Sequence, residues 1–242
     1  FIAAPGVHQG EVSEKIGYGG ASRTAEDVMV ARDCALALHT GASVCIQHIS
    51  SKNAVEYVRT AKKLGADVHA EATPHHFTLT DKAVLEYGTL ARMNPPVRTE
   101  EDRLKIIEGL CDGTIDMIAT DHAPHSAEEK SRGLEKSAMG IVGLETAFPL
   151  LYTYLVKPGV ISMERLMELL HDAPCRRFNI PTDTGFTVFD LNDSYRVDPA
   201  DFLSMGKATP FTGWEVQGRC LLTAAGETAV WYDACLLYTS PS

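Results

Sequence analysis

One stretch decides how this sequence is interpreted: Ile115-Asp116-Met117-Ile118-Ala119-Thr120-Asp121-His122-Ala123-Pro124-His125. Its first half is a mostly apolar run that is too short for a helix, so it predicts a buried strand. The run stops at Asp121, and a carboxylate there needs a cation, a proton or hydrogen bonds to compensate its burial. Asp121, His122 and His125 therefore bring acid–base and metal-binding groups together. A polar loop, with Asp121 capping a turn and both histidines solvated, explains the spacing equally well.

Length and charge limit the possible functions. With 242 residues, 45% hydrophobic and 22% charged, the chain can form one sizeable α/β domain, or a domain with an appendage, around a real core. The net charge is −10 and no run rich in lysine or arginine occurs, so nucleic acid and anionic membranes are not expected partners. No apolar run approaches the length of a membrane span.

The cysteines indicate a reducing compartment. The six are far apart and form no Cys-x-x-Cys pair, which argues against a disulfide framework or a zinc ribbon. Because no signal-peptide pattern is present, a cytoplasmic location is expected. The chain starts at Phe1 rather than at methionine, and we expect residues to be missing upstream.

Helical and strand patterns alternate in the first half of the chain. The predicted strands are 43–49, 67–73 and 115–119, and the predicted helices are 25–39, 52–64, 81–87 and 99–110. This order is typical of parallel strands joined by right-handed helical crossovers. The strands end in His48, in His75 and His76, and in Asp121. Ligand-binding and catalytic groups lie at that end in open α/β sheets and in (β/α)8 barrels.

The rest of the chain has a different character. Segments 1–22 and 126–137 are predicted to be loops, and helices are predicted at 143–156, 162–170 and 173–178. From about residue 182 the pattern changes to short β-like runs, at 186–191, 195–197, 214–223 and 229–232. We therefore expect a second, smaller β unit.

Taken singly, the candidate residues are ambiguous. A histidine such as His48 at a strand end is more often structural than a metal ligand, and His48 with Asp121 supplies only two of the three or four ligands that zinc needs. Met139 and Gly140 belong to a flexible Gly-x-x-Gly segment, 139–143, which is a weak indication of ligand contact by backbone N–H groups.

Four further polar residues have both a functional and a structural interpretation. His75 and His76 are adjacent, so they face opposite ways on a strand and are expected at the surface or in a supporting role. Asn94 precedes Pro95-Pro96, a stiff segment that can hold an amide still, although an ordinary turn explains it equally well. Arg98 can meet a carboxylate, but solvent exposure is the favoured expectation.

A family resemblance joins these observations. The chain resembles dihydroorotases, above all the bacterial class I type of the amidohydrolase superfamily, in order from about residue 1 to about residue 230. The segments that carry it are Gln47-His48-Ile49-Ser50, Glu71-Ala72-Thr73-Pro74-His75-His76, Met93-Asn94-Pro95-Pro96-Val97-Arg98, Ala119-Thr120-Asp121-His122-Ala123-Pro124-His125 and Gly140-Ile141-Val142-Gly143-Leu144-Glu145-Thr146. The third and fourth are specific to dihydroorotases rather than to hydantoinases and allantoinases.

The resemblance implies a zinc-dependent cyclic amide hydrolase that interconverts (S)-dihydroorotate and N-carbamoyl-L-aspartate in de novo pyrimidine biosynthesis. By position, His48 resembles a zinc ligand, and Asp121 resembles the general base that also contacts the metal. Asn94 and His125 resemble substrate-binding residues. Met139-Gly140 stands where the family usually has a Phe-Gly pair whose backbone contacts the substrate ring.

The resemblance also implies a partial fold. Residues 1–180 would be the C-terminal part of a (β/α)8 barrel, with its last three strands, residues 181–233 part of a small β-sandwich domain, and residues 234–242 a non-native tail. The family's His-x-His pair and its other metal ligands precede Phe1 in the family order. We therefore predict that this polypeptide alone is inactive and exposes apolar sheet surface.

Two rival functions remain. One is another cyclic amidohydrolase, such as a hydantoinase or an allantoinase. The other is an inactive dihydroorotase-like scaffold that binds a partner such as aspartate transcarbamoylase, and a missing His-x-His pair upstream would favour it. A homo-oligomer that acts on a small-molecule substrate is the expected assembly.

Overall fold

The computed structural model describes residues 2–182 and 184–233. These residues form two compact units. The first comprises 2–147 and 198–211, and the second comprises 148–197 and 212–233. The predicted tail at 234–242 lies outside the described residues, and the predicted domain boundary near residue 180 stays a prediction.

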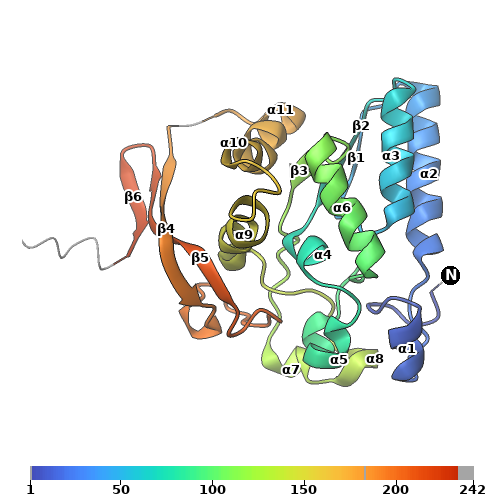
Figure 1. Cartoon of the computed structure of the whole chain (residues 1–242), viewed down its shortest axis with the longest axis horizontal. Helices are drawn as coiled ribbons and strands as arrows, with labels where there is room; N and C mark the ends of the chain where they lie inside the picture. Colours follow the sequence, from blue (N-terminus) through green and yellow to red (C-terminus); the bar gives the residue numbers. More distant parts are fainter. Residues whose placement is uncertain (1, 183, 234–242) are drawn as a thin grey trace, which may run out of the picture. The chain divides into compact units, whose positions relative to one another are not determined.

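A parallel sheet of three strands organises the first unit (Figure 1). The strands are β1 (Val44–Ile46), β2 (Val68–Ala72) and β3 (Met117–Ile118), in that order across the sheet. Residues 68, 70 and 72 of β2 are buried and alternate with half-buried ones, as the period of a strand requires. The fold is therefore α/β with parallel strands, as predicted, although each strand is shorter than its apolar run.

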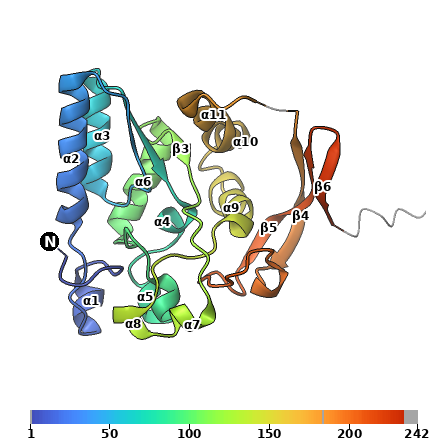
Figure 2. The ribbon, with the colours of Figure 1, turned by 180° about the vertical axis from the view of Figure 1, so that it is seen from behind.

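Three long helices accompany these strands: the first precedes β1, and the other two lie between β1 and β2 and between β2 and β3. They are α2 (Arg23–Thr40), α3 (Lys52–Lys63) and α6 (Glu100–Asp112), close to the predicted segments, and α2 and α3 run side by side (Figures 1 and 2). Their ends follow from local chemistry, because side chains at the N-caps accept the first free N–H groups. The Oγ atoms of Ser22 and Ser51 do so for α2 and α3, and Thr99 forms a capping box with Asp102.

Short helices fill the connections, most of them in segments that were not predicted to be helical; the exception, at 83–87, confirms the predicted helix 81–87. They are α1 (Glu11–Lys15), α4 (Pro74–Thr78), α5 (Ala83–Tyr87), α7 (Ala127–Lys130) and α8 (Gly133–Lys136), with 3₁₀ turns at Gly88–Ala91 and Pro199–Asp201. Loops throughout 1–22 and 126–137 were therefore wrong predictions. In the second segment the signal was a capping box, in which Ser126 and Glu129 bond to each other's backbone N–H groups.

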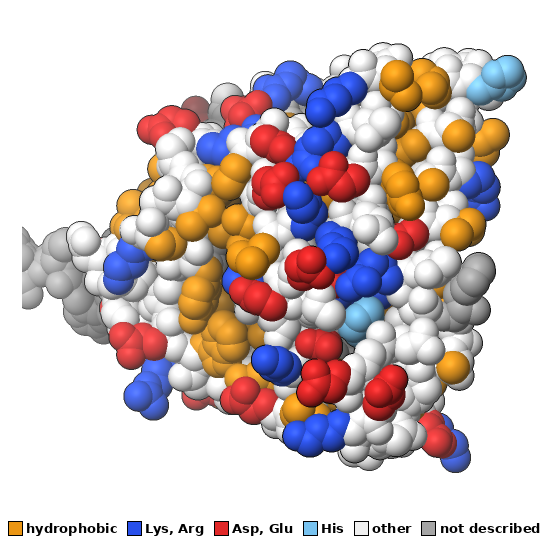
Figure 3. Space-filling model, turned by 45° about the vertical axis from the view of Figure 1, so that its right-hand side comes forward, with side chains coloured by type: hydrophobic (Ala, Val, Ile, Leu, Met, Phe, Trp, Pro, Cys, Tyr) orange, Lys and Arg blue, Asp and Glu red, His pale blue; other side chains and the backbone are white. Residues whose placement is uncertain are grey.

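The apolar faces of α3, α6 and the sheet form the core of this unit, with Val55, Val58, Ile106, Leu110 and Met117 almost fully buried. Outside this core, α3 and α6 are joined by ion pairs, of which Arg59–Asp112 at 2.7 Å is one. On the face in Figure 3, acidic and basic side chains are interspersed rather than separated into patches of one sign.

The second unit contains helical segments and an antiparallel sheet. The boundary between the units falls within α9 (Leu144–Leu151), which continues as a π-helical turn at Tyr152–Val156. The helical segments that follow are α10 (Met163–Met167), a second π-helical turn at Glu168–Asp172 and α11 (Ala173–Phe178). The sheet consists of β4 (Phe186–Arg196), β5 (Glu215–Ala225) and β6 (Thr228–Tyr232). Two predicted runs are thus one strand, β4, whose pairing with β5 shifts between Asp190 and Ser194. No helix among the described residues is long and apolar enough to span a membrane.

Candidate functional site

The predicted metal ligands follow two strands of the parallel sheet. His48 comes two residues after β1 and Asp121 three residues after β3. Both residues have left-handed backbones, with φ of 38° and 47°. A non-glycine residue in that region costs on the order of 1–3 kcal/mol and persists where surrounding contacts enforce it, often at functional sites. The two strand ends therefore resemble each other in backbone as well as in polarity.

Glu71, on the strand between them, links these two residues electrostatically. Its carboxylate accepts a hydrogen bond from the backbone N–H of His48 and is repelled by Asp121. Burial raises the pKa of Asp121, and the attraction of the His48 imidazole partly offsets that rise. The sheet order β1-β2-β3 thus places an imidazole and two carboxyl groups within electrostatic reach of one another.

His48 and Asn94 line one pocket, of about 210 Å³. His48 is half-buried and Asn94 is exposed. Gln47, Pro95 and Arg98 also line this pocket. A predicted metal ligand and a predicted substrate-binding amide therefore face the same space, although they are 46 positions apart (94 − 48) in the sequence.

Of the two expectations for His75 and His76, a place at the surface is wrong, whereas the contacts of His76 fit a supporting role. Both are buried, 2% and 3% exposed, in the first turn of α4. The Nε2 atom of His76 donates to the carbonyl of Pro95 (2.9 Å), so its Nδ1 accepts from the Thr73 hydroxyl (2.7 Å). Burial lowers the pKa of His76 to about 3. This neutral imidazole therefore ties the segment after Asn94 to the end of β2.

A second group of predicted residues meets around His125. The Nε2 atom of His125 lies 3.0 Å from the carbonyl oxygen of Met139 and donates to it. Gly140 has φ of +118°, and a Cβ atom there would lie 2.5 Å from the Cβ of Ala123. The loops 119–125 and 139–143 are thus in direct contact, and only glycine fits at position 140.

Sequence reasoning missed a buried lysine that supports this second group. Lys130 is 3% exposed, and its Nζ donates to the carbonyl oxygens of Arg92, Ala138 and Gly140 at 2.9–3.2 Å. Burial, with a smaller contribution from the charge of Arg92, lowers the pKa of Lys130 to about 8. The lysine joins the backbone on both sides of Met139 to the segment that leads to Asn94.

His122, the third polar residue of the opening stretch, has a structural role. Its Nδ1 accepts hydrogen bonds from the backbone N–H groups of Gly143 (3.1 Å) and Leu144 (3.2 Å), so the ring proton is on Nε2. The neighbouring Ser204 hydroxyl donates to Glu145 at 2.6 Å. Because the imidazole has no free lone pair toward Ser204, these groups cannot act as a nucleophilic triad. His122 instead caps the start of α9.

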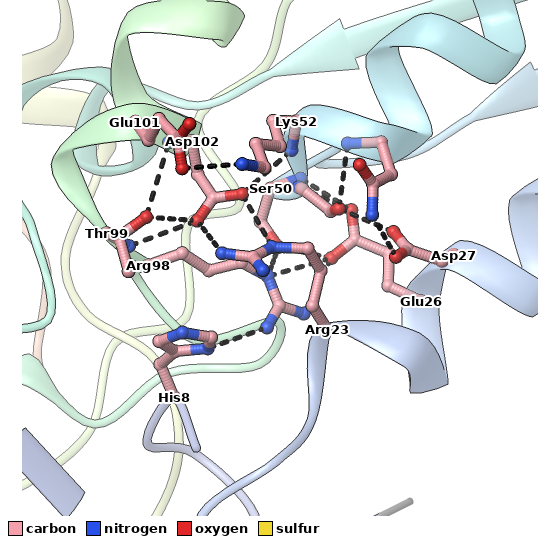
Figure 4. A network of polar contacts seen from close by, with 12 residues as sticks. His8, Arg23, Glu26, Asp27, Ser50, Lys52, Arg98, Thr99, Glu101 and Asp102 are labelled. Carbon is pink, nitrogen blue, oxygen red and sulfur yellow. Dashed lines mark hydrogen bonds and ion pairs between the residues drawn. The ribbon is translucent and has the colours of Figure 1, made fainter. Parts of the chain in front are cut away.

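Arg98 contradicts the expectation that it lies in solvent. It is 4% exposed, and its Nη2 donates to the Glu26 carboxylate at 2.8 Å. Its Nη1 donates to the Nδ1 of His8 at 3.1 Å, and Figure 4 shows these groups converging. No local sequence pattern could predict this ion pair, because Glu26 is 72 positions earlier in the sequence. The alternative expectation, that Arg98 meets a carboxylate, is therefore confirmed.

His8 makes this network sensitive to acid. Burial, and then the nearby charges of Arg98 and Arg23, lower its pKa to about 4, against a partial opposing effect of Asp102 and Glu26. The folded protein therefore takes up this proton near pH 4, whereas the unfolded chain takes it up near pH 6.5. Between these values the unfolded state binds more protons, so stability is full above pH 6.5 and is lost as the pH falls.

We expect the free energy of unfolding to depend on His8 in this window. Between pH 6.5 and pH 4 the wild-type chain should lose about 3 kcal/mol through this group, and His8→Gln should lack that loss. Urea unfolding at a series of pH values measures the difference. The exposed His39 provides the control, since His39→Gln should keep the wild-type slope. Equal slopes for His8→Gln and the wild type would contradict the assignment.

The site can be tested for its fit to a metal ion. Imidazole nitrogen and carboxylate oxygen are ligands that zinc accepts, and His48 and Asp121 offer one of each. Among residues 2–182 and 184–233, no cluster of three or more histidine, cysteine, aspartate or glutamate residues is arranged to hold a metal ion. His48 and Asp121 alone would supply two of the three or four ligands that zinc requires.

No model of a known protein family matches the chain, but curated proteins do. Dihydroorotases of Bacillus cytotoxicus and of Bacillus cereus are each 45% identical to it over 232 residues. The matched part is 93% of this chain and 54% of each of those proteins. The chain therefore spans about half the length of these relatives.

Solved structures give a related result. The L-hydantoinase (dihydropyrimidinase) of Arthrobacter aurescens superimposes with a TM-score of 0.81 at 30% identity, over 86% of this chain and 49% of that one. A D-hydantoinase (dihydropyrimidinase) from a Thermus species also gives 0.81, over 87% of this chain and 49% of that one, at 23% identity. The second likeness shows a shared fold alone.

Proposed function

Since this chain is 45% identical to dihydroorotases over 232 residues, we propose that it belongs to the dihydroorotase family and is part of a zinc-dependent cyclic amide hydrolase. The reaction is the reversible hydrolysis of (S)-dihydroorotate to N-carbamoyl-L-aspartate, a step of pyrimidine biosynthesis. The observation that carries the proposal is that His48 and Asp121 share a left-handed backbone just after β1 and β3, the two strands that flank β2, in a chain 45% identical to dihydroorotases. Strands β1, β2 and β3 would be three strands of a (β/α)8 barrel.

His48 and Asp121 would hold a zinc ion together with ligands from outside this chain. A bound zinc ion would lower the pKa of water and polarise the ring carbonyl. Asp121 would accept the proton of the attacking water and return it to the departing ring nitrogen, as a general base and then a general acid. In the metal-free chain, burial raises the pKa of the Asp121 carboxyl group, and the attraction of His48 partly offsets that rise.

The remaining proposed residues bind and orient the substrate. The Asn94 side chain, which lines the pocket beside His48, would hydrogen-bond a polar edge of the ring. His125 donates its Nε2 proton to the carbonyl of Met139, its Nδ1 lies 3.7 Å from the Glu129 carboxylate, and we propose that the imidazole ring contacts the substrate. Backbone groups of Met139 and Gly140 would contact the ring itself, which is why a methionine in place of phenylalanine changes little.

A zinc and activity assay tests the proposal. We expect the chain alone to hydrolyse no dihydroorotate and to bind zinc weakly, because it offers two ligands, and the complete protein to retain zinc and be active. Metal analysis and the fall in dihydroorotate absorbance measure the two properties. Hydrolysis by the purified chain alone would refute the partial-site model.

The same assay separates the two rivals. The L-hydantoinase likeness favours testing hydantoins beside dihydroorotate, and a clear preference for hydantoins would replace the proposed substrate. A complete protein that keeps neither zinc nor activity would favour the scaffold, for which binding to aspartate transcarbamoylase is the assay. Cytoplasmic location and homo-oligomerisation remain predictions.

A further inference from the structure

The segments on either side of the pocket are joined by a buried ion pair. Glu26 lies in the first turn of α2, and Arg98 lies four residues after Asn94 (98 − 94). Their side chains are 13% and 2% exposed and pair at 2.8 Å. Glu26 and Arg98 both line the pocket of His48 and Asn94. Because water is largely excluded, breaking such a pair by removing one partner is costly.

Glu26 holds the backbone that follows His48. Its Oε1 accepts the N–H groups of Ser50 (2.7 Å) and Ser51 (2.9 Å), and its Oε2 accepts the hydroxyl of Ser50. These contacts fix the two residues after Ile49, whose own N–H donates to the carbonyl of Glu71 at 2.9 Å. The left-handed turn at His48 is therefore held in place by bonds immediately downstream of it.

Arg98 carries this constraint to the other side of the pocket. Its Nε donates to the Ser50 Oγ at 2.8 Å, while its backbone carbonyl accepts from the N–H of Asp81 at 2.8 Å. Pro95 and Pro96 stiffen the chain between Arg98 and Asn94, since proline fixes φ. Figure 4 shows Arg98, Ser50 and Glu26 in mutual contact. The Arg98 donors named here bond to Ser50, Glu26 and His8, which gives Arg98 a positioning role.

We infer that the Glu26–Ser50–Arg98 cluster is a positioning device that sets His48 and Asn94 relative to each other, and thereby couples metal binding to substrate binding. This inference rests on the proposed function, in which His48 holds zinc and Asn94 holds the substrate. Partners that orient a ligating residue typically change metal affinity or activity by about 10–100-fold when they are altered. Both properties should therefore change together.

Ser50→Ala and Arg98→Lys in the complete protein test the inference. Ser50→Ala removes the link without leaving a buried charge unpaired, and Arg98→Lys keeps the charge but cannot reach Ser50 and Glu26 together. For each we expect KM for dihydroorotate to rise about 10-fold and zinc loss to a chelator to become about 10-fold easier. The control is Arg103→Lys, in a more exposed ion pair with Glu100, which should change neither.

The outcomes are distinguishable. Variants that lose thermal stability but keep the wild-type KM and zinc affinity would overturn the positioning role. If the variants do not fold, hydrogen exchange in the unmutated protein decides: removing zinc should speed exchange at residues 50–51 and 97–98 together, because coupling is reciprocal. Unchanged exchange at 97–98 overturns the inference. If the wild-type protein binds zinc but does not hydrolyse dihydroorotate, the proposed function is wrong. In that case zinc affinity and hydrogen exchange still test the positioning role of the Glu26–Ser50–Arg98 cluster.

Discussion

Asp121→Asn is expected to lower turnover of the complete enzyme by about 10³-fold, within the range that general acid–base groups contribute. The amide cannot take the proton of the attacking water at any ordinary pH, and it is a poorer metal ligand than a carboxylate. Asparagine is nearly the same size and tolerates a left-handed backbone such as the φ of 47° at this position. The fold should therefore survive.

Steady-state kinetics, metal content and thermal unfolding together measure this effect. The control is Glu100→Gln, which removes one negative charge from an exposed side chain that pairs with Arg103 and should leave turnover unchanged. Turnover of Asp121→Asn within about threefold of the wild type, with normal zinc content, would remove Asp121 from the proton transfer.

Gly140→Ala is expected to have the second-largest effect, on both stability and substrate binding. A Cβ atom would lie 2.5 Å from the Cβ of Ala123, and φ is +118°, a region that side chains rarely adopt. Strain and overpacking together should cost about 3 kcal/mol. Relief of the clash must move the loop of His125, because the two loops touch. We expect KM to rise at least about 10-fold.

Gly113→Ala separates the two causes. Gly113 also has a positive φ, +81°, but nothing lies within 4 Å of its would-be Cβ. This variant should cost only about 1 kcal/mol and leave KM unchanged. Urea unfolding and kinetics on both variants make the comparison. Equal destabilisation by the two substitutions would show that the contact with Ala123 is unimportant.

Much of the first unit was predictable from local pattern. The helices α2, α3 and α6 were predicted to within three residues at each end, because their caps and apolar periodicity are local properties. The strands were placed correctly but predicted too long. Strand ends depend on the partner's register, and β3 pairs with β2 at only two positions.

The site was predictable only in part. His48 and Asp121 stood out as polar residues at strand ends, and the family resemblance assigned their roles. Arg98, Lys130 and His76 were missed or misjudged because their partners are distant in the sequence. Arg98 meets Glu26, Lys130 meets the carbonyl of Arg92, and His76 meets that of Pro95. Composition says only that such residues prefer water, and it cannot show which of them will be paired.

The sequence by itself therefore determined the alternation of strands and helices, the polar ends of three strands and the resemblance to dihydroorotases. Those properties follow from side-chain periodicity, helix capping and short sequence motifs, each of which involves only a few residues. Tertiary structure alone decided that Arg98 and Lys130 are buried and that His48 and Asn94 share a pocket. The physical reason is that burying a charge is favourable only when partners from remote segments compensate its desolvation, and the fold determines where those segments meet.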